Sequence, residues 1–314
     1  MSQASDFHFI NKKRSNKLVQ IKANWELYVL IIFPVAYFFI FKYMPMYGVQ
    51  IAFKDFVPSQ GIWGSAWIGF EHFQRFFDSY NFTQILKNTV FLSLLLLFIA
   101  FPIPIIIAIM LNQVAHHRIK RFIQTAIYAP YFISTVVLVG MVFVFLSPNS
   151  GLVNHIVVAF GGDPILFMAE SEWFRPLYVF TEVWQNTGFA SVIYLAALAG
   201  IDPHLHEAAV VDGASKWQRI RHIDLPGIAP TITILFILAI GNLMNIGFEK
   251  AFLMQTDINV DTSEIIPTYV YKMGIQRAEY SFSAAVGLFN ALINLVLLIV
   301  VNRTVKRLNG TSLF

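Results

Sequence analysis

Long runs of apolar residues dominate the pattern along this chain, and polar residues gather in the segments between them. A helix needs about 20 mostly apolar residues to cross the hydrocarbon core of a bilayer. Because six stretches reach that length, the pattern predicts an all-α membrane protein with six transmembrane helices. The expected spans are Leu27–Tyr47, Asn88–Asn112, Thr125–Leu146, Leu177–Gly200, Ala229–Phe248 and Phe282–Asn302.

The composition supports a membrane protein and narrows its chemistry. Of the 314 residues, 57% are hydrophobic and 13% are charged, whereas a soluble domain carries about 25% charged residues. The chain has no cysteine, which excludes a disulfide framework and a thiolate nucleophile. The first apolar run lacks a small-residue cleavage site at its end, so we expect it to be a retained span. Pro102 and Pro104 are expected to kink the second span.

The basic residues are distributed unequally between the two sides that a six-span chain would have. Because cytoplasmic loops carry an excess of Lys and Arg, the richer side is assigned to the cytoplasm. We therefore expect a protein of the cytoplasmic membrane with cytoplasmic tails at 1–24 and 303–314 around a transmembrane domain at 25–302. The outer segments would be 48–86, 147–176 and 249–281, with short helices. Fourteen of the 22 Lys and Arg residues lie on the assigned cytoplasmic side: Lys12, Lys13, Arg14, Lys17, Lys22, Arg118, Lys120, Arg121, Lys216, Arg219, Arg221, Arg303, Lys306 and Arg307.

The connection between the fourth and fifth spans contains several helix-boundary signals. Asp202 followed by Pro203 is a typical N-cap and first-turn pair. Gly213 stands where a left-handed residue would end that short helix. Ser215 and Gln218 match a capping box that starts a second helix. The connection is therefore predicted to form a helix–turn–helix at the cytoplasmic surface of the membrane.

Residues 202–226 resemble the EAA loop of binding-protein-dependent ABC import permeases. The family pattern is E-A-A, three residues, Gly, nine residues and then Ile-x-Leu-Pro, and the matching residues are Glu207, Ala208, Ala209, Gly213, Ile223, Leu225 and Pro226. In the family this loop forms the coupling helix that docks into a groove on the ATPase subunit, and the resemblance implies that role here. Pro226 is expected to stop the second short helix before the fifth span. An ordinary surface helix–turn–helix is the alternative.

Shorter stretches extend the resemblance to most of the chain. Three look like segments of the second, third and fourth spans of these permeases: Asn88–Thr89, Tyr128–Ser134 and Trp184–Gly188. Others are similar to the subgroup that imports oligosaccharides of complex polysaccharides such as rhamnogalacturonan or alginate: Tyr47–Asp55, Gly247–Lys250, Thr268–Tyr271 and Asn309–Phe314. The identity of the sugar does not follow from these stretches.

The resemblance implies one transmembrane subunit of a type I ABC importer for oligosaccharides, working by alternating access within membrane lipid. The expected partners are a second homologous permease, two ATPase subunits and an extracytoplasmic solute-binding protein, with no nucleic acid. No G-x-x-x-x-G-K-[ST] sequence occurs in the chain, so ATP and Mg²⁺ are expected on the ATPase subunits and no cofactor or enzyme activity on this one. An ion-coupled secondary transporter, or an ABC import permease for a non-sugar solute, is the alternative.

Polar side chains within the expected spans are candidates for the substrate path, because lipid makes such groups costly. Amides and aromatic rings suit a sugar, which offers hydroxyl groups for hydrogen bonds and C–H faces for stacking. The candidates are Glu182, Trp184, Asn186, Tyr194, Asn242, Asn245, Asn290 and Asn294. The alternative for each is hydrogen bonding between helices. His204 and His206 are two positions apart and would point away from each other on a helix, so no metal site is expected.

Overall fold

The computed structural model describes residues 23–309 and residue 313, with the side chains of 23–307 and 313. The basic residues expected in the N-terminal tail, and residues 310–312 and 314 of the C-terminal ending, lie outside this described part. The chain divides into two compact units, Met1–Gln50 and Ile51–Phe314. The sequence-based boundaries 1–24, 25–302 and 303–314 stay a prediction.

The first expected span is confirmed as a helix. Four pieces follow one another without interruption: α2 (Trp25–Phe38), a π-helical turn (Phe39–Tyr43), α3 (Met44–Met46) and a 3-10 helix (Tyr47–Phe53). The stretch has 29 residues, longer than the expected Leu27–Tyr47. No residue of α2 is buried, and beyond Glu26 in the first turn its side chains are apolar or aromatic on every face. This pattern is typical of a helix surrounded by lipid or by other spans.

The second expected span is confirmed as one helix with an inserted π-helical turn. It consists of α6 (Phe82–Leu95), the π turn (Leu96–Ala100) and α7 (Pro102–Asn112). Pro102 has no backbone N–H, and its ring clashes with the carbonyl four residues earlier. The N–H of Phe101 donates to the carbonyl of Leu96, five residues back, at 3.1 Å. A widened turn is thus the local response to the proline.

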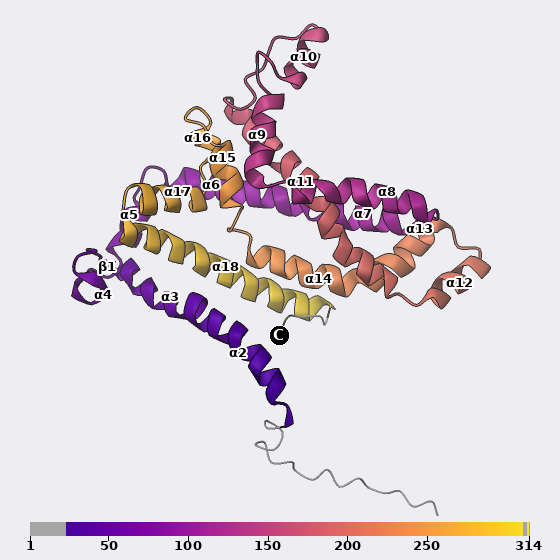
Figure 1. Cartoon of the computed structure of the whole chain (residues 1–314), viewed down its shortest axis with the longest axis horizontal. Coiled ribbons are helices and arrows are strands. Elements are labelled where there is room, and N and C mark those ends of the chain that lie inside the picture. The colour runs from indigo at the N-terminus through magenta and orange to yellow at the C-terminus, as the bar shows by residue number, and fades with distance from the viewer. Residues whose placement is uncertain (1–22, 310–312, 314) are drawn as a thin grey trace, which may run out of the picture. The chain divides into compact units, whose positions relative to one another are not determined.

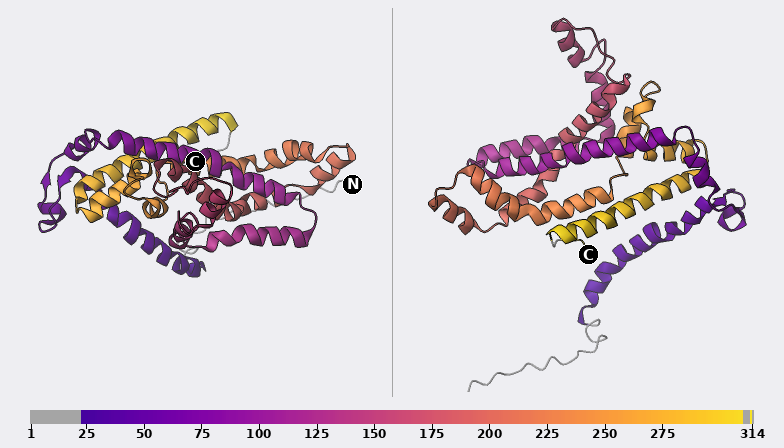
Figure 2. Two further views of the ribbon diagram at one scale, coloured as in Figure 1. Left: turned by 90° about the horizontal axis from the view of Figure 1, so that it is seen from above. Right: turned by 180° about the vertical axis from the view of Figure 1, so that it is seen from behind.

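The third expected span, Thr125–Leu146, is wrong as a single helix. The chain forms α8 (His117–Tyr128) with a 3-10 turn (Ala129–Phe132), and then α9 (Thr135–Phe145), bent by 97°. Ser134 is extended, and its hydroxyl accepts a hydrogen bond from the Val137 N–H at 3.3 Å, which starts α9. The apolar run hid this boundary, because hydrophobicity alone says nothing about backbone direction. α10 (Leu152–Ala159), which follows α9, projects away from the long helices of the second unit (Figure 1 and Figure 2).

The fourth and fifth expected spans are confirmed as helices with different ends. α11 (Ser171–Ala199) has 29 residues and, at 1.5 Å per residue, is about 43 Å long, so it extends past the hydrocarbon core. α12 (Pro203–Val211) follows at a bend of 71°. The next helix is continuous over 26 residues and consists of α13 (Lys216–Arg219), a π turn (Ile220–Asp224) and α14 (Leu225–Gly241).

Two expected boundaries in this region are wrong. Pro226 does not stop the helix, because the π turn before it lets the N–H of Leu225 donate to the carbonyl of Ile220. The fifth span ends at Gly241 and not at Phe248, since the chain turns there and resumes as α15 (Phe248–Met254). Glycine and asparagine favour helix ends, but the apolar residues around them outweighed that signal in the sequence.

The sixth expected span lies within α18 (Tyr280–Asn309) and is confirmed. Short elements fill the segments expected outside the membrane, including a two-strand antiparallel ladder in which Lys54 faces Trp67. Besides α10 and α15, they are β1 (Lys54–Asp55), α4 (Gly61–Gly64), β2 (Ala66–Trp67), α5 (Glu71–Phe77), α16 (Val260–Ser263), α17 (Ile266–Tyr271) and a π turn (Lys272–Gln276). In the second unit, β1, α5 and α17 lie at one end and α12 at the other (Figure 1).

The spans and their core fit the expected fold class. By length and composition, four described helices could each cross a membrane, or six if each bent pair is one span. α11 packs against α7, α8, α14 and α16, so the fourth span is central to the second unit. Its Phe174 and Tyr178 are buried together with Leu92 of α6 and Met254 of α15. The fold is therefore a helical membrane protein in which α11 organises the packing.

Candidate functional site

The EAA-like segment adopts the local structure that its capping residues predict. Asp202 begins α12 by accepting a hydrogen bond from the N–H two residues later, at 3.0 Å. Gly213 has a φ of +77°, and the N–H that follows it bonds back to the carbonyl of Ala209 at 2.8 Å, which ends α12 as a Schellman motif does. The capping box between Ser215 and Gln218 is present and starts α13. The predicted helix–turn–helix is confirmed, and its place at the cytoplasmic surface of the membrane stays a prediction.

The exposed surface of this segment combines charged side chains, Glu207 among them, with small and apolar ones. The Glu207 side chain is 73% exposed and lies 3.3 Å from Nδ1 of His204. Ala208 is exposed, and Ala209 is half-buried. Four large apolar side chains of α12 and α13 are also exposed: Leu205, Val210, Val211 and Trp217. Small and apolar side chains let the backbone of another protein approach closely.

A buried carboxylate, missed in the sequence, connects α12 to the ends of two spans. Asp224 is fully buried in the position that the EAA pattern leaves free, between the half-buried Ile223 and Leu225. Its Oδ1 atom lies 3.3 Å from Nε2 of His206 on α12. Its Oδ2 atom accepts a hydrogen bond at 3.1 Å from Gln113, at the end of α7. Asp224 therefore lies in contact with both α12 and the end of α7.

A cavity of about 250 Å³ lies between the second, fourth and fifth spans. Three of the substrate-path candidates line it: Glu182 from α11, and Asn242 and Asn245 from the turn after α14. The two asparagines were expected inside the fifth span and lie beyond its end. Phe101 and Tyr178 add aromatic surface. Amides and a carboxylate beside aromatic faces suit a solute that is rich in hydroxyl groups.

The Glu182 carboxylate belongs to a charged network beside this cavity. Its Oε2 atom accepts a hydrogen bond from Nζ of Lys250 at 2.5 Å, and its Oε1 atom accepts one from the Asn186 amide at 2.7 Å. Nζ of Lys250 also lies 5.5 Å from the centroid of the Tyr178 ring. Sequence reasoning missed Lys250 as a site residue, because it lies beyond the expected end of the fifth span. Its place in the family-like stretch Gly247–Lys250 was the one signal of its importance.

Asn290 and Asn294 bind the backbone and a neighbouring amide, not the cavity. The amide nitrogen of Asn290 donates to Oδ1 of Asn245 at 2.9 Å, and Oδ1 of Asn294 accepts from the Met244 N–H at 3.0 Å. Both side chains are buried. Because Met244 and Asn245 lie in the turn after α14, the two asparagines hold that turn against α18. This geometry favours the interhelical alternative for both.

Trp184 and Tyr194 are not among the residues that line the cavity. Trp184 is 41% exposed on α11. Tyr194 is buried and packs with Ala108 of α7 and Ile228 of α14. Glu182, Asn242 and Asn245 therefore lie together at the cavity, and Asn186 is hydrogen-bonded to Glu182. The two aromatic candidates lie outside the cavity.

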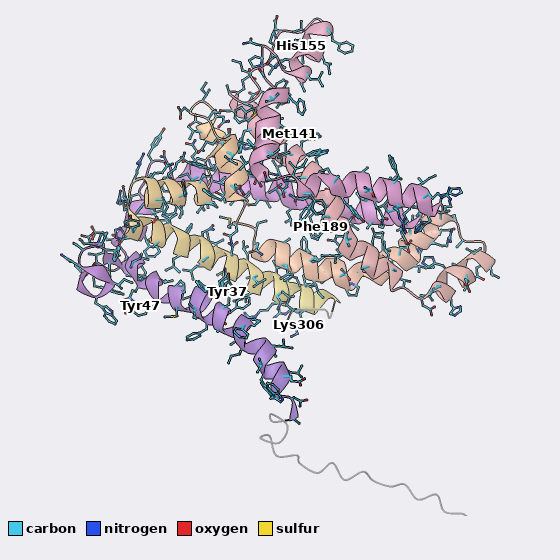
Figure 3. All side chains as sticks on the ribbon, viewed as in Figure 1. Tyr37, Tyr47, Met141, His155, Phe189 and Lys306 are labelled. Carbon is cyan, nitrogen blue, oxygen red and sulfur yellow. The ribbon has the colours of Figure 1, made fainter. Side chains whose placement is uncertain are left out.

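Two of the family-like stretches meet where α11 crosses α8 and its 3-10 turn. The Gln185 side chain donates to the carbonyl of Ile133 at 2.8 Å. The ring of Phe189, labelled in Figure 3, stacks on a tyrosine ring of the 3-10 turn with centroids 4.1 Å apart. A β-carbon on Gly188 would lie 1.9 Å from the carbonyl oxygen of Ile127. Close helix packing therefore explains these two stretches.

The histidines of the EAA-like segment have protein partners. His204 lies beside Glu207, and His206 lies beside Asp224. Within residues 23–309 and 313, no group of three or more His, Asp or Glu residues is placed to hold a metal ion.

Comparison with known proteins identifies the family. Residues 100–310 match the binding-protein-dependent transport system inner membrane components. The polygalacturonan/rhamnogalacturonan transport system permease protein YteP of Bacillus subtilis (strain 168) is 42% identical over 306 residues, which cover 98% of this chain and 95% of that protein.

Two solved structures share the fold over almost the whole chain. One is a bacterial ABC transporter involved in the import of the acidic polysaccharide alginate, with a TM-score of 0.86 and 40% identity over 94% of this chain and 100% of that chain. The other is a bacterial alginate ABC transporter in complex with an alginate pentasaccharide-bound periplasmic protein, with a TM-score of 0.86 and 39% identity over 94% of this chain and 99% of that chain. The chain therefore belongs to the binding-protein-dependent transport system inner membrane components, as a non-catalytic permease subunit of an ABC importer whose ATPase is a separate subunit.

Proposed function

We propose that this permease passes oligosaccharides of an acidic polysaccharide, such as polygalacturonan, rhamnogalacturonan or alginate, across the cytoplasmic membrane. The cavity between the second, fourth and fifth spans carries the proposal, because two amides, one carboxylate and two aromatic rings line one space. A sugar presents hydroxyl groups to the amides and C–H faces to the rings. The 42% identical relative is a permease of a polygalacturonan/rhamnogalacturonan transport system. The 40% identical chain of known structure comes from a transporter involved in the import of alginate.

The chain would work within a larger assembly. A single chain has one EAA-like segment, so a second homologous permease would supply the other half of the pathway and the other docking surface. Two ATPase subunits would bind ATP and Mg²⁺ and contact the exposed face around Glu207, Ala208 and Ala209, with Gly213 fixing its shape. An extracytoplasmic solute-binding protein would deliver the sugar, as the complex of the alginate transporter with its periplasmic protein suggests.

The orientation that fits these partners places both termini and α12 in the cytoplasm. In support of it, α12 lies at the opposite end of the second unit from β1, α5 and α17 (Figure 1). Reporter fusions at Asp163 and Asp257 should then score outside, and a fusion at Ser215 should score inside. A cytoplasmic Asp257 would contradict the orientation.

The direct test of the proposed function is uptake by the complete complex in proteoliposomes. The permease, its partner permease and the ATPase are reconstituted, and uptake of labelled oligogalacturonide is measured with the binding protein outside and ATP inside. Uptake should require ATP, the binding protein and this chain together. Uptake driven by a proton gradient without ATP, or the absence of any oligosaccharide uptake alongside transport of a non-sugar solute, would overturn the proposal.

A further inference from the structure

In the Glu182–Lys250 ion pair, the carboxylate faces the cavity and the positive charge of the lysine is buried behind it. The Glu182 side chain lines the cavity and is 29% exposed, whereas the Lys250 side chain is 6% exposed and lies behind it. An ammonium group has three hydrogen-bond donors. In the part of the chain that the structure describes, the one acceptor that Lys250 contacts is the Glu182 carboxylate. The lysine therefore keeps donors for a second acceptor.

The charge of the cavity wall creates a problem for an acidic substrate. Among the residues that line the cavity, Glu182 is the charged one, and it carries the same sign as the carboxylate of a uronate sugar. A carboxylate that leaves water needs a hydrogen-bonded positive partner, because an isolated buried charge is very costly. Lys250 is the cation next to this wall, at 2.5 Å from the Glu182 carboxylate. The Glu182 carboxylate separates the Lys250 ammonium group from the cavity.

We infer that a carboxylate of the sugar takes the place of Glu182 as the partner of Lys250 while the substrate occupies the cavity. The inference rests on the proposed function, since it assumes an acidic oligosaccharide. The pair is neutral before the exchange, and Lys250 with the sugar carboxylate is neutral after it. The displaced Glu182 keeps its negative charge at the 29% exposed cavity wall, where the Asn186 amide donates to it. Lys250 thereby becomes the residue that distinguishes acidic from neutral sugars.

The surroundings of the pair allow the exchange. Asn186 donates to the other oxygen of Glu182 at 2.7 Å, so Glu182 keeps a hydrogen-bond partner on its own helix when it leaves Lys250. The hydroxyl of Tyr178 donates to the carbonyl of Gly247 at 3.2 Å, which holds the start of α15 against α11. Lys250 is on α15 and therefore stays in place while the shorter Glu182 side chain moves.

A purely structural ion pair between α11 and α15 is the competing explanation, and the two differ in the sign of their effects. If the pair is structural, loss of either partner lowers the uptake of every sugar alike. If the exchange occurs, removing Glu182 removes a competitor for Lys250, whereas removing Lys250 removes the carboxylate site itself. The two single variants should then shift the preference for acidic sugar in opposite directions.

The experiment measures uptake of two probes by the reconstituted complex: oligogalacturonide with free carboxylates, and the same oligosaccharide fully methyl-esterified. For each variant, the uptake of the free acid is divided by the uptake of the ester, and this ratio is compared with that of wild type. The comparison cancels the preference of the binding protein. Lys250→Met should lower this ratio about tenfold, as expected for the loss of a charged hydrogen bond. Glu182→Gln should raise the ratio. The double variant should carry the ester and show the low ratio of Lys250→Met.

A second ion pair on the same chain supplies the matched control. Lys272 and Glu264 are 2.8 Å apart with half-buried side chains, and neither lines the cavity. Lys272→Met and Glu264→Gln make the same charge changes and should leave the ratio at its wild-type value. A wild-type ratio in the Glu182→Gln/Lys250→Met double variant would overturn the inference. Wild-type complex that carries neither probe, and no rhamnogalacturonan or alginate oligosaccharide either, would instead refute the proposed function.

Discussion

The EAA-like segment and the packed face of α11 both depend on a glycine, for opposite physical reasons. At Gly213 the backbone has a φ of +77°, and an added β-carbon would meet no atom within 4 Å, so the conformation alone requires glycine. At Gly188 the backbone is helical, and an added β-carbon would lie 1.9 Å from the carbonyl oxygen of Ile127. The EAA-like segment is thus shaped by local conformation, and the packed face of α11 by contact with α8.

The polar groups of the two regions show the same difference. In the EAA-like segment, Ser215 and Gln218 cap a helix three residues apart. At the cavity, Glu182 and Lys250 are 68 positions apart and meet through the packing of α11 against α15. Substitutions in the first region should therefore change the shape of one surface, while those in the second should affect the whole bundle or the solute.

The largest effect is expected for Gly188→Ala. The new methyl group would overlap a backbone carbonyl of α8, which cannot move aside as a flexible side chain can, so the cost should reach or exceed the upper part of the roughly 1–3 kcal/mol range for overpacking. Purified permease complex should show a much lower unfolding temperature and poor accumulation in membranes. Gly140→Ala is the control, since a β-carbon at that helical site would meet no atom within 4 Å. Equal stability of the two variants would show that α11 and α8 are not in close backbone contact.

A smaller and more selective effect is expected for Gly213→Val. A left-handed backbone costs an ordinary residue about 1–2 kcal/mol, so the turn should relax and displace α12 without disturbing the spans. Retention of the ATPase during co-purification and sugar-stimulated hydrolysis should fall, while membrane insertion stays normal. Glu207→Lys should lower the same two readouts by reversing the exposed charge.

The control for this prediction is Gly161→Val. Gly161 has a φ of +84° and open space around its β-carbon position, so the local strain is the same in the segment between α10 and α11. ATPase retention should stay at the wild-type level in this variant. If Gly213→Val and Glu207→Lys also retain the ATPase fully, the EAA-like segment is not the coupling element.

The smallest effects are expected for two amides that distinguish packing from transport. Asn290→Leu removes a hydrogen bond to Asn245, and such interhelical bonds contribute about 1 kcal/mol or less, so a small loss of thermal stability should accompany any loss of uptake. Asn186→Leu removes the second partner of Glu182 and should lower the uptake of acidic sugar at unchanged stability. Thermal unfolding and uptake, measured on the same preparations, test the predictions for these two variants. Full uptake by Asn186→Leu would remove that residue from the transport path.

Much of the fold followed from the sequence, because the signals involved are local. Long apolar runs predict spans, since the length of a helix in lipid depends on its own residues. Capping residues such as Asp202, Gly213 and Ser215 act on backbone groups within a few positions. The same locality explains the errors. The apolar run around Ser134 concealed a bend, and the residues around Gly241 concealed the end of the fifth span.

The candidate site was only half predictable. Glu182, Asn242 and Asn245 could be selected because a polar side chain within an apolar run is costly wherever it lies. The sequence contained no indication that Trp184 and Tyr194 lie elsewhere, since polarity does not reveal which face of a helix meets which neighbour.

The sequence by itself therefore determined the helical membrane fold class, the helix–turn–helix between the fourth and fifth expected spans, and the family. Only the tertiary structure decided that Asp224 joins His206 to Gln113, and that Lys250 lies behind Glu182 at the cavity. The physical reason is that the polar atoms in such contacts come from different helices. Which atoms meet depends on how those helices pack, and no local pattern of residues records that packing.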